Sequence, residues 1–349
     1  TLLPLTACQT TSPSPKLGAI APRTGDEILV AGTLVHTGTP VVLWFDPGGY
    51  DAYRVDRRFV PVDQASWDAS KGRLNTPNRY GVRTRPDGQP LPHDTSLATL
   101  QKSVDQFVIH YDVCGTSRRC FQILHDVRGL SVHFLLDVDG TIYQTLDLKE
   151  RAWHATIAND RSIGIEIAHI GAYPPNAAAP LDRWYTRDAQ GLRLTIPDDQ
   201  GDGGVRTPNF VGRPRSPGFL TGVIQNQTLT QPDFTPEQYR ALAHLTAALH
   251  LALPQIRLDA PRGPDGAVLT RALTPEEFSS FKGVLGHHHV QANKIDPGPA
   301  FDWEWLLREA RALAATGATP TALSSPTRRV KASSPAADAS SSSLRSRGD

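Results

Sequence analysis

Two short apolar runs limit most strongly what this chain can fold into. They cover residues 107–110 and 163–167, and each suits a strand that is buried inside a sheet. A helix-like stretch follows the first run, at about residues 117–127. Because strands followed by helices are typical of α/β domains, we predict a mixed central β-sheet flanked by helices.

Turn and capping signals predict further elements. Residues 132–136 and 141–144 are separated by a turn that contains Asp and Gly, and together they predict a hairpin. Helices are expected after Thr235 and Thr274, because each Thr is followed by Pro and, three positions on, by Gln or Glu. A last helix is expected to begin after Asp302.

The composition argues against some classes of partner. Lys and Arg number 36 against 35 Asp and Glu, so no whole-chain field attracts nucleic acid, and nucleic acid is not predicted as a partner. No apolar run approaches the roughly 20 residues that a membrane-spanning helix requires. The 29 prolines and a hydrophobic fraction of 39% indicate much loop and linker.

Changes in composition divide the chain into segments. We predict a signal remnant and tether over residues 1–23, an N-terminal extension or small accessory sheet over 24–100, the main domain over 101–317 and a disordered tail over 318–349. Within the main domain, residues 171–231 are rich in Gly and Pro and too long for an ordinary connection. This stretch is either functional or an insertion with some structure of its own.

Chemically active side chains occur at three places. His110 ends the first apolar run, where a single His is more often structural than a ligand. Glu166 lies among aliphatic residues, and a carboxylate is rarely buried there without a cation or a chemical task. Residues 286–299 form a loop with three imidazoles, an ammonium and a carboxylate. Together with His110, this loop supplies two imidazoles and one carboxylate for an open zinc site.

Four stretches of the chain match, in order, the motifs of one family: residues 107–110, 131–134 with 139–144, 151–155 with 159–166, and 286–287 with 294–299. In these motifs the sequence resembles the type-2 N-acetylmuramoyl-L-alanine amidases, which share their fold with phage lysozyme-type amidases and animal peptidoglycan recognition proteins. The resemblance covers about residues 105–170 and 280–305. It implies peptidoglycan as the partner, and hydrolysis of the amide between N-acetylmuramic acid and L-alanine.

Carried over residue by residue, the resemblance assigns a zinc site and its catalytic groups. The zinc ligands fall on His110, His287 and Asp296, the catalytic carboxylate on Glu166 and the transition-state lysine on Lys294. The interval between the second and third ligands is slightly shorter than in many bacterial members. The neighbouring histidines at 288 and 289 therefore stay open as alternatives for the second ligand.

The resemblance also bears on four other side chains. Trp153 and His154 are expected to line the substrate groove, with a purely structural role as the alternative for His154. Cys114 and Cys120 resemble a short disulfide of the recognition-protein branch, which contributes about 2 kcal/mol in an oxidising compartment.

Two rival functions remain at this point: a recognition module that binds peptidoglycan without cutting it, and a zinc peptidase that acts on stem peptides.

The beginning of the sequence is similar to the end of an apolar signal segment. Residues 5–8, Leu-Thr-Ala-Cys, resemble the lipobox of bacterial lipoproteins, in which the Cys becomes lipidated. The alternative is an ordinary signal remnant with an incidental Cys. The lipobox interpretation makes Cys8 a lipid anchor and places the protein in the cell envelope, in the periplasm or another extracytoplasmic compartment.

Lipidation of Cys8 is directly testable in cells that express the native precursor. A clickable fatty-acid probe should label the protein, and Cys8→Ser should abolish the label, because the thiol is the acceptor. Cys120→Ser serves as the matched control and should leave the label unchanged. A mature protein that lacks Cys8 and carries no label would contradict the lipobox interpretation.

Overall fold

Six strands form the central sheet of the protein, in the order β12-β4-β7-β5-β6-β3. Their bounds are β3 (Val41–Leu43), β4 (Gln106–Tyr111), β5 (Phe134–Leu136), β6 (Ile142–Gln144), β7 (Ser162–Ile167) and β12 (Gly283–Gly286). Only β5 and β6 pair in antiparallel orientation, as the predicted hairpin, and the other neighbours are parallel. The predicted mixed central sheet is therefore confirmed.

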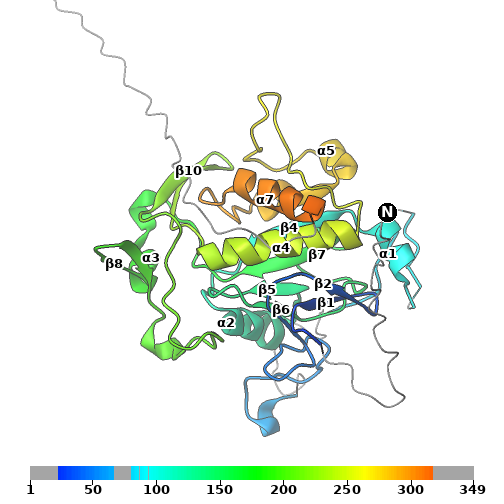
Figure 1. The fold of residues 1–349 in the computed structure, drawn as a ribbon, viewed down its shortest axis with the longest axis horizontal. Coiled ribbons are helices and arrows are strands. Elements are labelled where there is room, and N and C mark those ends of the chain that lie inside the picture. The colour runs from blue at the N-terminus through cyan, green and yellow to red at the C-terminus, as the bar shows by residue number, and fades with distance from the viewer. Residues whose placement is uncertain (1–22, 67–79, 86, 93, 317–349) are drawn as a thin grey trace, which may run out of the picture. The chain divides into compact units, whose positions relative to one another are not determined.

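The computed structural model describes residues 23–66, 80–85, 87–92 and 94–316 (Figure 1). Cys8 and the predicted tail over 318–349 lie outside the described residues. No helix in the described part of the chain is long and apolar enough to cross a bilayer.

Seven α-helices accompany the sheet in the described residues: α1 (Leu97–Ser103), α2 (Ser117–Phe121), α3 (Ala179–Trp184), α4 (Pro236–Ala252), α5 (Pro275–Ser280), α6 (His287–Val290) and α7 (Trp303–Thr316). A π-helical turn, η3 (Gln122–Arg128), continues α2, so the predicted helix near 117–127 is confirmed. Three further two-stranded sheets are β1 (Glu27–Val30) with β2 (Thr33–His36), β8 (Tyr185–Asp188) with β9 (Gly191–Leu194), and β10 (Leu220–Ile224) with β11 (Gln227–Gln231).

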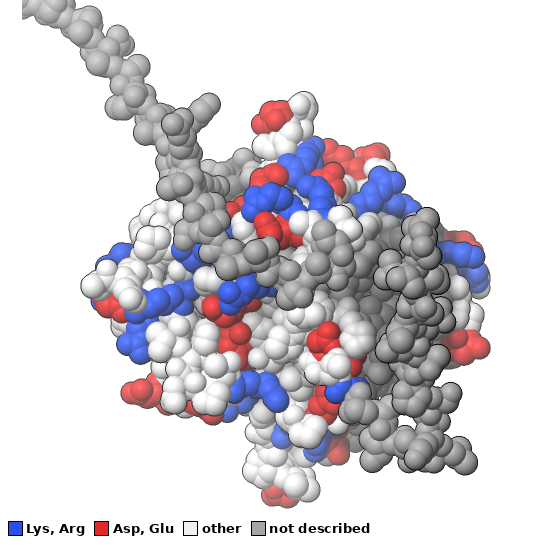
Figure 2. Space-filling view, viewed as in Figure 1, with Lys and Arg blue, Asp and Glu red and all other residues white. Residues whose placement is uncertain are grey.

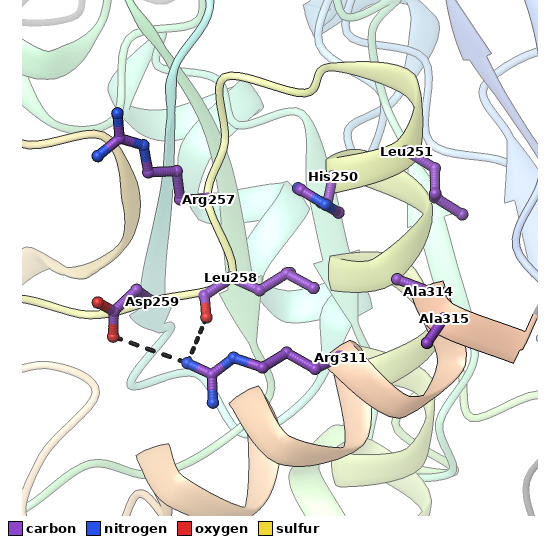
Figure 3. A pocket seen from close by; sticks show the side chains of 8 residues that line it. All are labelled: His250, Leu251, Arg257, Leu258, Asp259, Arg311, Ala314 and Ala315. Atoms are coloured by element: carbon purple, nitrogen blue, oxygen red, sulfur yellow. Dashed lines mark hydrogen bonds and ion pairs between the residues drawn. The ribbon is translucent and has the colours of Figure 1, made fainter.

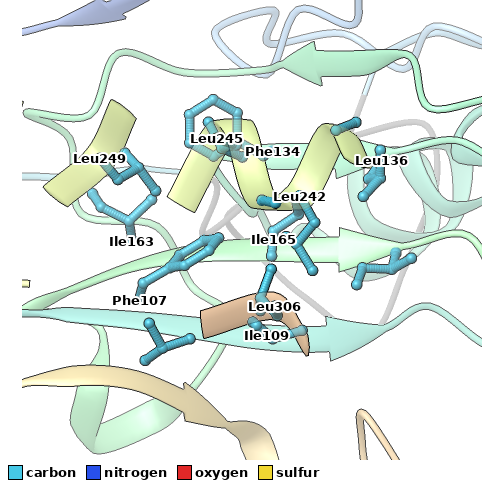
Figure 4. Close-up of a cluster of buried hydrophobic side chains, with 14 of the residues drawn as sticks. Phe107, Ile109, Phe134, Leu136, Ile163, Ile165, Leu242, Leu245, Leu249 and Leu306 are labelled. Carbon is cyan, nitrogen blue, oxygen red and sulfur yellow. The ribbon is translucent and has the colours of Figure 1, made fainter. Parts of the chain in front are cut away.

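Helices α4 and α7 cover one face of the sheet (Figure 1). Alternate residues of each strand point to this face, where they meet leucines of the two helices (Figure 4). The shared core includes Phe107 and Ile109 of β4, Ile163 and Ile165 of β7, and Leu242, Leu245 and Leu306 of the helices. Burying each such side chain stabilises the fold by about 1.5–3 kcal/mol. The intervening residues, His110 and Glu166 among them, consequently belong to the opposite face.

The predicted helix starts are confirmed by their hydrogen bonds. The Thr235 hydroxyl accepts the Gln238 N–H, and the Gln238 side chain accepts the Thr235 N–H in return. Thr274 and Glu277 form the same capping box at α5. Each box satisfies two N–H groups that the first helical turn leaves without partners.

In three regions the structure contains elements that the sequence did not define. The loop predicted over 286–299 instead begins with the end of β12 and the short helix α6. In the N-terminal region, β3 extends the central sheet by pairing with β6, whereas β1 and β2 form a hairpin of their own. The stretch 171–231 contains α3 and the hairpins β8–β9 and β10–β11. The division into an N-terminal extension, a main domain and an insertion stays a prediction.

Candidate metal centre

The parallel register of β4 and β7 places His110 directly beside Glu166. Because paired residues of neighbouring strands point to the same face, both side chains leave the sheet opposite α4 and α7. On the other side of β4, β12 pairs with it and ends at Gly286, so His287 follows at the same edge of the sheet. The strands thus bring together residues that are far apart in the sequence.

Three side-chain atoms converge at this edge. His110 Nδ1 lies 2.9 Å from His287 Nδ1, and each of the two nitrogens lies 3.0 Å from Asp296 Oδ2. All three residues are buried. A tetrahedral zinc ion with ligands at about 2.0–2.1 Å separates its ligand atoms by about 3.3 Å, so this triangle fits zinc after a small expansion.

Hydrogen bonds on the far side of each imidazole define its tautomer. His287 Nε2 lies 2.7 Å from the Gln291 amide oxygen, which only accepts, so Nε2 carries the proton and Nδ1 has a free lone pair. His110 Nε2 lies 3.0 Å from His154 Nδ1, and His154 Nε2 lies 3.2 Å from the Ser162 hydroxyl. Each group in this row of hydrogen bonds has a suitable partner when His110 Nε2 donates its proton to His154 Nδ1. His110 Nδ1 then carries no proton and is an acceptor.

The electrostatics of the cluster agree with this assignment. Burial, followed by the neighbouring His287, lowers the pKa of His110 to about 4, which keeps the imidazole neutral. Burial alone would raise the pKa of Asp296, but the two imidazoles outweigh it and hold that pKa well below its usual range. In the tautomers that the outer hydrogen bonds indicate, one carboxylate oxygen and two imidazole nitrogens with free lone pairs face one another. Two imidazole nitrogens and one carboxylate oxygen are a ligand set that suits zinc.

The structure also distinguishes the three consecutive histidines. Only His287 points to the cluster. His288 holds the Asp296 carbonyl through its own N–H and Nδ1, at 3.1 and 3.0 Å. His289 Nδ1 accepts the Gly286 N–H, and its Nε2 lies 2.6 Å from the Leu269 carbonyl. The geometry therefore favours His287 as the second ligand and gives its neighbours a supporting role.

Glu166 and Lys294, the two predicted catalytic residues, have different surroundings. Glu166 is partly buried, and its Oε2 has no hydrogen-bond partner among the described residues. Burial, followed by the charges of Asp296 and Asp112, raises the pKa of the Glu166 carboxyl well above its usual range. Lys294 is partly exposed in the loop that leads to Asp296, and its positive charge contributes to lowering the pKa of His110.

His154 contacts the candidate ligand His110, in keeping with the structural alternative for it, and its groove-lining role stays a prediction. Its ring occupies the space above Gly164, where a Cβ atom would come within 2.5 Å of His154 Nδ1. Because Gly164 has no side chain, the His154 imidazole can occupy this space and contact His110. Trp153 is partly buried, with the Arg151 guanidinium 4.4 Å from its ring centroid.

A buried arginine, which the sequence did not indicate as a site residue, holds the turn before β7. The Arg83 guanidinium donates to the carbonyls of Leu148, Asn159 and Ser162, and it lies 3.1 Å from His133 Nε2. Asn159 in turn accepts the N–H of His154 through its side chain, at 3.1 Å. These contacts fix the turn before β7, and no sequence pattern marks Arg83 out from other arginines.

The predicted disulfide is not formed in the structure. Cys114 and Cys120 are free thiols, and their sulfur atoms lie within 4.8 Å of each other and of an Asp112 carboxylate oxygen. Oxidation would require the two sulfurs to approach to about 2.05 Å. The disulfide therefore stays a prediction.

The remaining surface contains a pocket that is separate from the metal centre. It lies between the end of α4 and α7, with His250, Arg257 and Arg311 in its walls (Figure 3). Arg311 donates to the Leu258 carbonyl there, at 2.6 Å. None of the predicted site residues lines this pocket.

On the face seen in Figure 2, acidic and basic side chains lie interspersed, in keeping with the balanced charge.

The fold and the site define an α/β protein with a candidate metal centre at one edge of its sheet. Residues 100–197 match the family described as N-acetylmuramoyl-L-alanine amidase. The match includes His110, His154 and Glu166, and it reaches into the stretch 171–231. It ends before His287, Lys294 and Asp296, so their placement rests on the structure.

Several solved structures are similar to this chain at low identity. The amidase AmiD from E. coli is 19% identical, with 65% of each chain covered and a TM-score of 0.34, so the chain spans just under two thirds of its length. The amidase LysC from Clostridium intestinale is 15% identical, over 61% of this chain and 88% of its own, with a TM-score of 0.32. Drosophila PGRP-LB is 14% identical, over 71% and 91%, with a TM-score of 0.27. Such similarity does not define a reaction, and no curated protein matches the sequence.

The close contact between Gly164 and His154 gives a prediction. Gly164→Ala should displace the His154 ring, release His110 and weaken zinc binding by about tenfold or more, because partners of metal ligands orient them. The matched control is Gly218→Ala, since a Cβ atom at Gly218 meets nothing within 4 Å. Competition with a chromophoric chelator measures the affinity. Equal zinc affinities for the two variants would contradict a role for His154 in holding His110.

Proposed function

We propose that this protein is a zinc-dependent amidase that hydrolyses the bond between N-acetylmuramic acid and L-alanine in peptidoglycan. One observation carries the zinc assignment: three buried acceptor atoms, His110 Nδ1, His287 Nδ1 and Asp296 Oδ2, face one another at 2.9–3.0 Å. The amidase family of residues 100–197 supports the reaction class. The choice of bond and the role of each site residue belong to the proposal.

His110, His287 and Asp296 would hold the metal, with the Nδ1 atoms and Oδ2 as ligands. A zinc ion bound there supplies a Lewis acid and lowers the pKa of water at its open position towards about 7. His154 and Gln291 keep the two imidazoles in the required tautomer. Burial keeps His110 neutral, so its lone pair is available at neutral pH.

Glu166 would move the proton during hydrolysis. Its carboxylate takes a proton from the attacking water as the water oxygen bonds to the lactyl carbonyl carbon. It then delivers this proton to the L-alanine nitrogen as the C–N bond breaks, leaving a free amine and a lactyl carboxylic acid, which loses the second proton of the water to solvent. Burial raises the pKa of Glu166, so the carboxyl holds the transferred proton more firmly than a solvated one.

Lys294 would stabilise the charge that develops on the carbonyl oxygen. It lies two residues before Asp296, and its side chain is partly exposed. A cation in this place contributes more in the transition state than in the bound substrate, because the oxygen becomes fully charged only during the reaction.

Zinc content tests the metal assignment. Purified protein should carry about one zinc ion per chain, and chelation should abolish amidase activity that zinc restores. His287→Ala should lose the metal, whereas His288→Ala should retain it with weaker binding, since the His288 side chain contacts the backbone carbonyls of Asp296 and Leu269 and not the three ligand atoms. Metal analysis of each variant gives the answer. Full activity of metal-free protein would refute the assignment.

Glu166→Gln tests the catalytic step. The amide keeps the shape and removes the base, so the variant should retain its fold and zinc and lose turnover by roughly two or more orders of magnitude. Glu276→Gln, at an exposed position on α5, is the matched control. Lys294→Ala should reduce turnover more than binding, with the exposed Lys102→Ala as its control.

The measurement is the release of L-alanine-terminated stem peptides from purified sacculi, followed by mass spectrometry. Unchanged release by Glu166→Gln would show that another group is the base. Binding of sacculi without any release by the parent protein would favour the non-catalytic recognition module. New termini within the stem peptide would instead identify a zinc peptidase.

A further inference from the structure

The hairpin β10–β11 lies against the segment that carries two of the three candidate metal ligands. This ligand segment covers residues 286–300, and the hairpin belongs to the stretch 171–231, whose role the motifs leave open. At the hairpin turn, Gln225 and Asn226 have φ values of 51° and 60°, as a tight two-residue turn requires. The turn therefore places the Gln225 side chain at a defined position.

The hairpin is itself fixed to the body of the protein. Ile224 and Leu229 are buried in the main hydrophobic core. Thr230 exchanges two backbone hydrogen bonds with Tyr173, at 2.7 and 3.0 Å, and the Gln225 N–H donates to the Thr270 carbonyl at 2.8 Å. An element anchored at so many points can hold a neighbouring loop in place.

Gln231 holds the end of the ligand segment. Its side chain is fully buried, its amide NH2 donates to the Pro297 carbonyl at 2.9 Å, and its oxygen accepts the Ala300 N–H at 3.0 Å. The approach is so close that a Cβ atom at Gly298 would lie 2.2 Å from the Gln231 oxygen. Pro297 directly follows Asp296, so this contact restricts the third ligand.

Gln225 holds the beginning of the ligand segment. Its amide NH2 donates to the carbonyls of His288 and Gln291, at 2.8 and 3.3 Å. Its oxygen accepts the Ala272 N–H at 3.2 Å, which uses both ends of the amide. Gln291 in turn contacts His287 Nε2 through its side chain. The contact therefore restricts the second ligand, as Gln231 restricts the third.

We propose that the β10–β11 hairpin is a brace that holds the ligand segment in its metal-ready arrangement before the metal binds, with Gln225 and Gln231 as positioning residues. The metal part of this inference rests on the proposed function, whereas the bracing of the segment does not. Residues 292–295 lie between the contacts that Gln225 and Gln231 make with the ligand segment. Lys294 is therefore on a part of the loop that these two glutamines do not hold. The stretch 171–231 thereby has a role in the site without supplying a ligand.

Hydrogen exchange of the metal-free protein tests the brace without depending on zinc. Gln231→Met and Gln225→Met keep the length of the side chain and remove its hydrogen bonds. Backbone amides in a peptide covering residues 286–300 should exchange at least about tenfold faster in either variant, because the segment opens more readily when its hydrogen bonds to the hairpin are lost. Gln227→Met is the matched control, an exposed glutamine on the same hairpin, and it should match the parent. Unchanged exchange in both test variants would overturn the inference.

Zinc affinity tests the consequence for the metal. Competition with a chromophoric chelator should give a zinc Kd about tenfold higher for Gln231→Met and Gln225→Met, and an unchanged Kd for Gln227→Met. A melting curve of each metal-free variant separates this effect from general unfolding. A parent that binds no zinc would refute the proposed function and leave the exchange result to decide on the brace. Normal zinc affinity in both test variants would refute the brace as a determinant of metal binding.

Discussion

Three electron-pair donors held about 3 Å apart inside a protein repel one another, and this repulsion explains much of the surrounding structure. Two imidazole nitrogens and a carboxylate oxygen would separate if their backbones were free to move. They remain together because β4 and β12 pair in parallel on one side, and the loop after α6 is held on the other. A cation bound between the three atoms would offset this repulsion.

The residues that hold the candidate ligands in position form successive layers around them. His154 and Gln291 hold the two imidazoles directly. Behind them, Gly164 leaves room for the His154 ring, and Asn159 accepts its backbone N–H. Buried Arg83 then holds the carbonyl groups of the turn that carries Asn159. Each layer restricts the next by hydrogen bonds or by close contact, so a change several residues away from the candidate metal ligands can alter their geometry.

The sequence predicts the parts of the fold that depend on local signals. The buried strands around Ile109 and Ile165, the hairpin of β5 with β6, and the capping boxes at Thr235 and Thr274 all have a pattern within a few residues. Strand β12 has no such pattern, because its four residues include two glycines and its partner lies far away in the sequence. Its pairing with β4 becomes visible only in three dimensions.

The candidate site shows the same limit. His110, His287 and Asp296 follow from a family resemblance, and the structure brings the three together, although their role as ligands stays a proposal. The resemblance leaves three histidines open, and only their hydrogen bonds separate His287 from the others. Gln225 and Gln231 could not be predicted, because a glutamine that contacts a distant backbone carbonyl has no pattern of its own.

The distance along the chain between the first two candidate ligands affects how the protein can be made. His110 and His287 are separated by 177 positions, so a growing chain completes β4 long before it contains β12. Until then one edge of β4 has unpaired N–H and C=O groups and is open to pairing with other chains. Docking of β12 thus both completes this side of the sheet and brings His287 to the candidate metal centre. A chain that stops before residue 283 would lack both the site and the strand that protects this edge of the sheet.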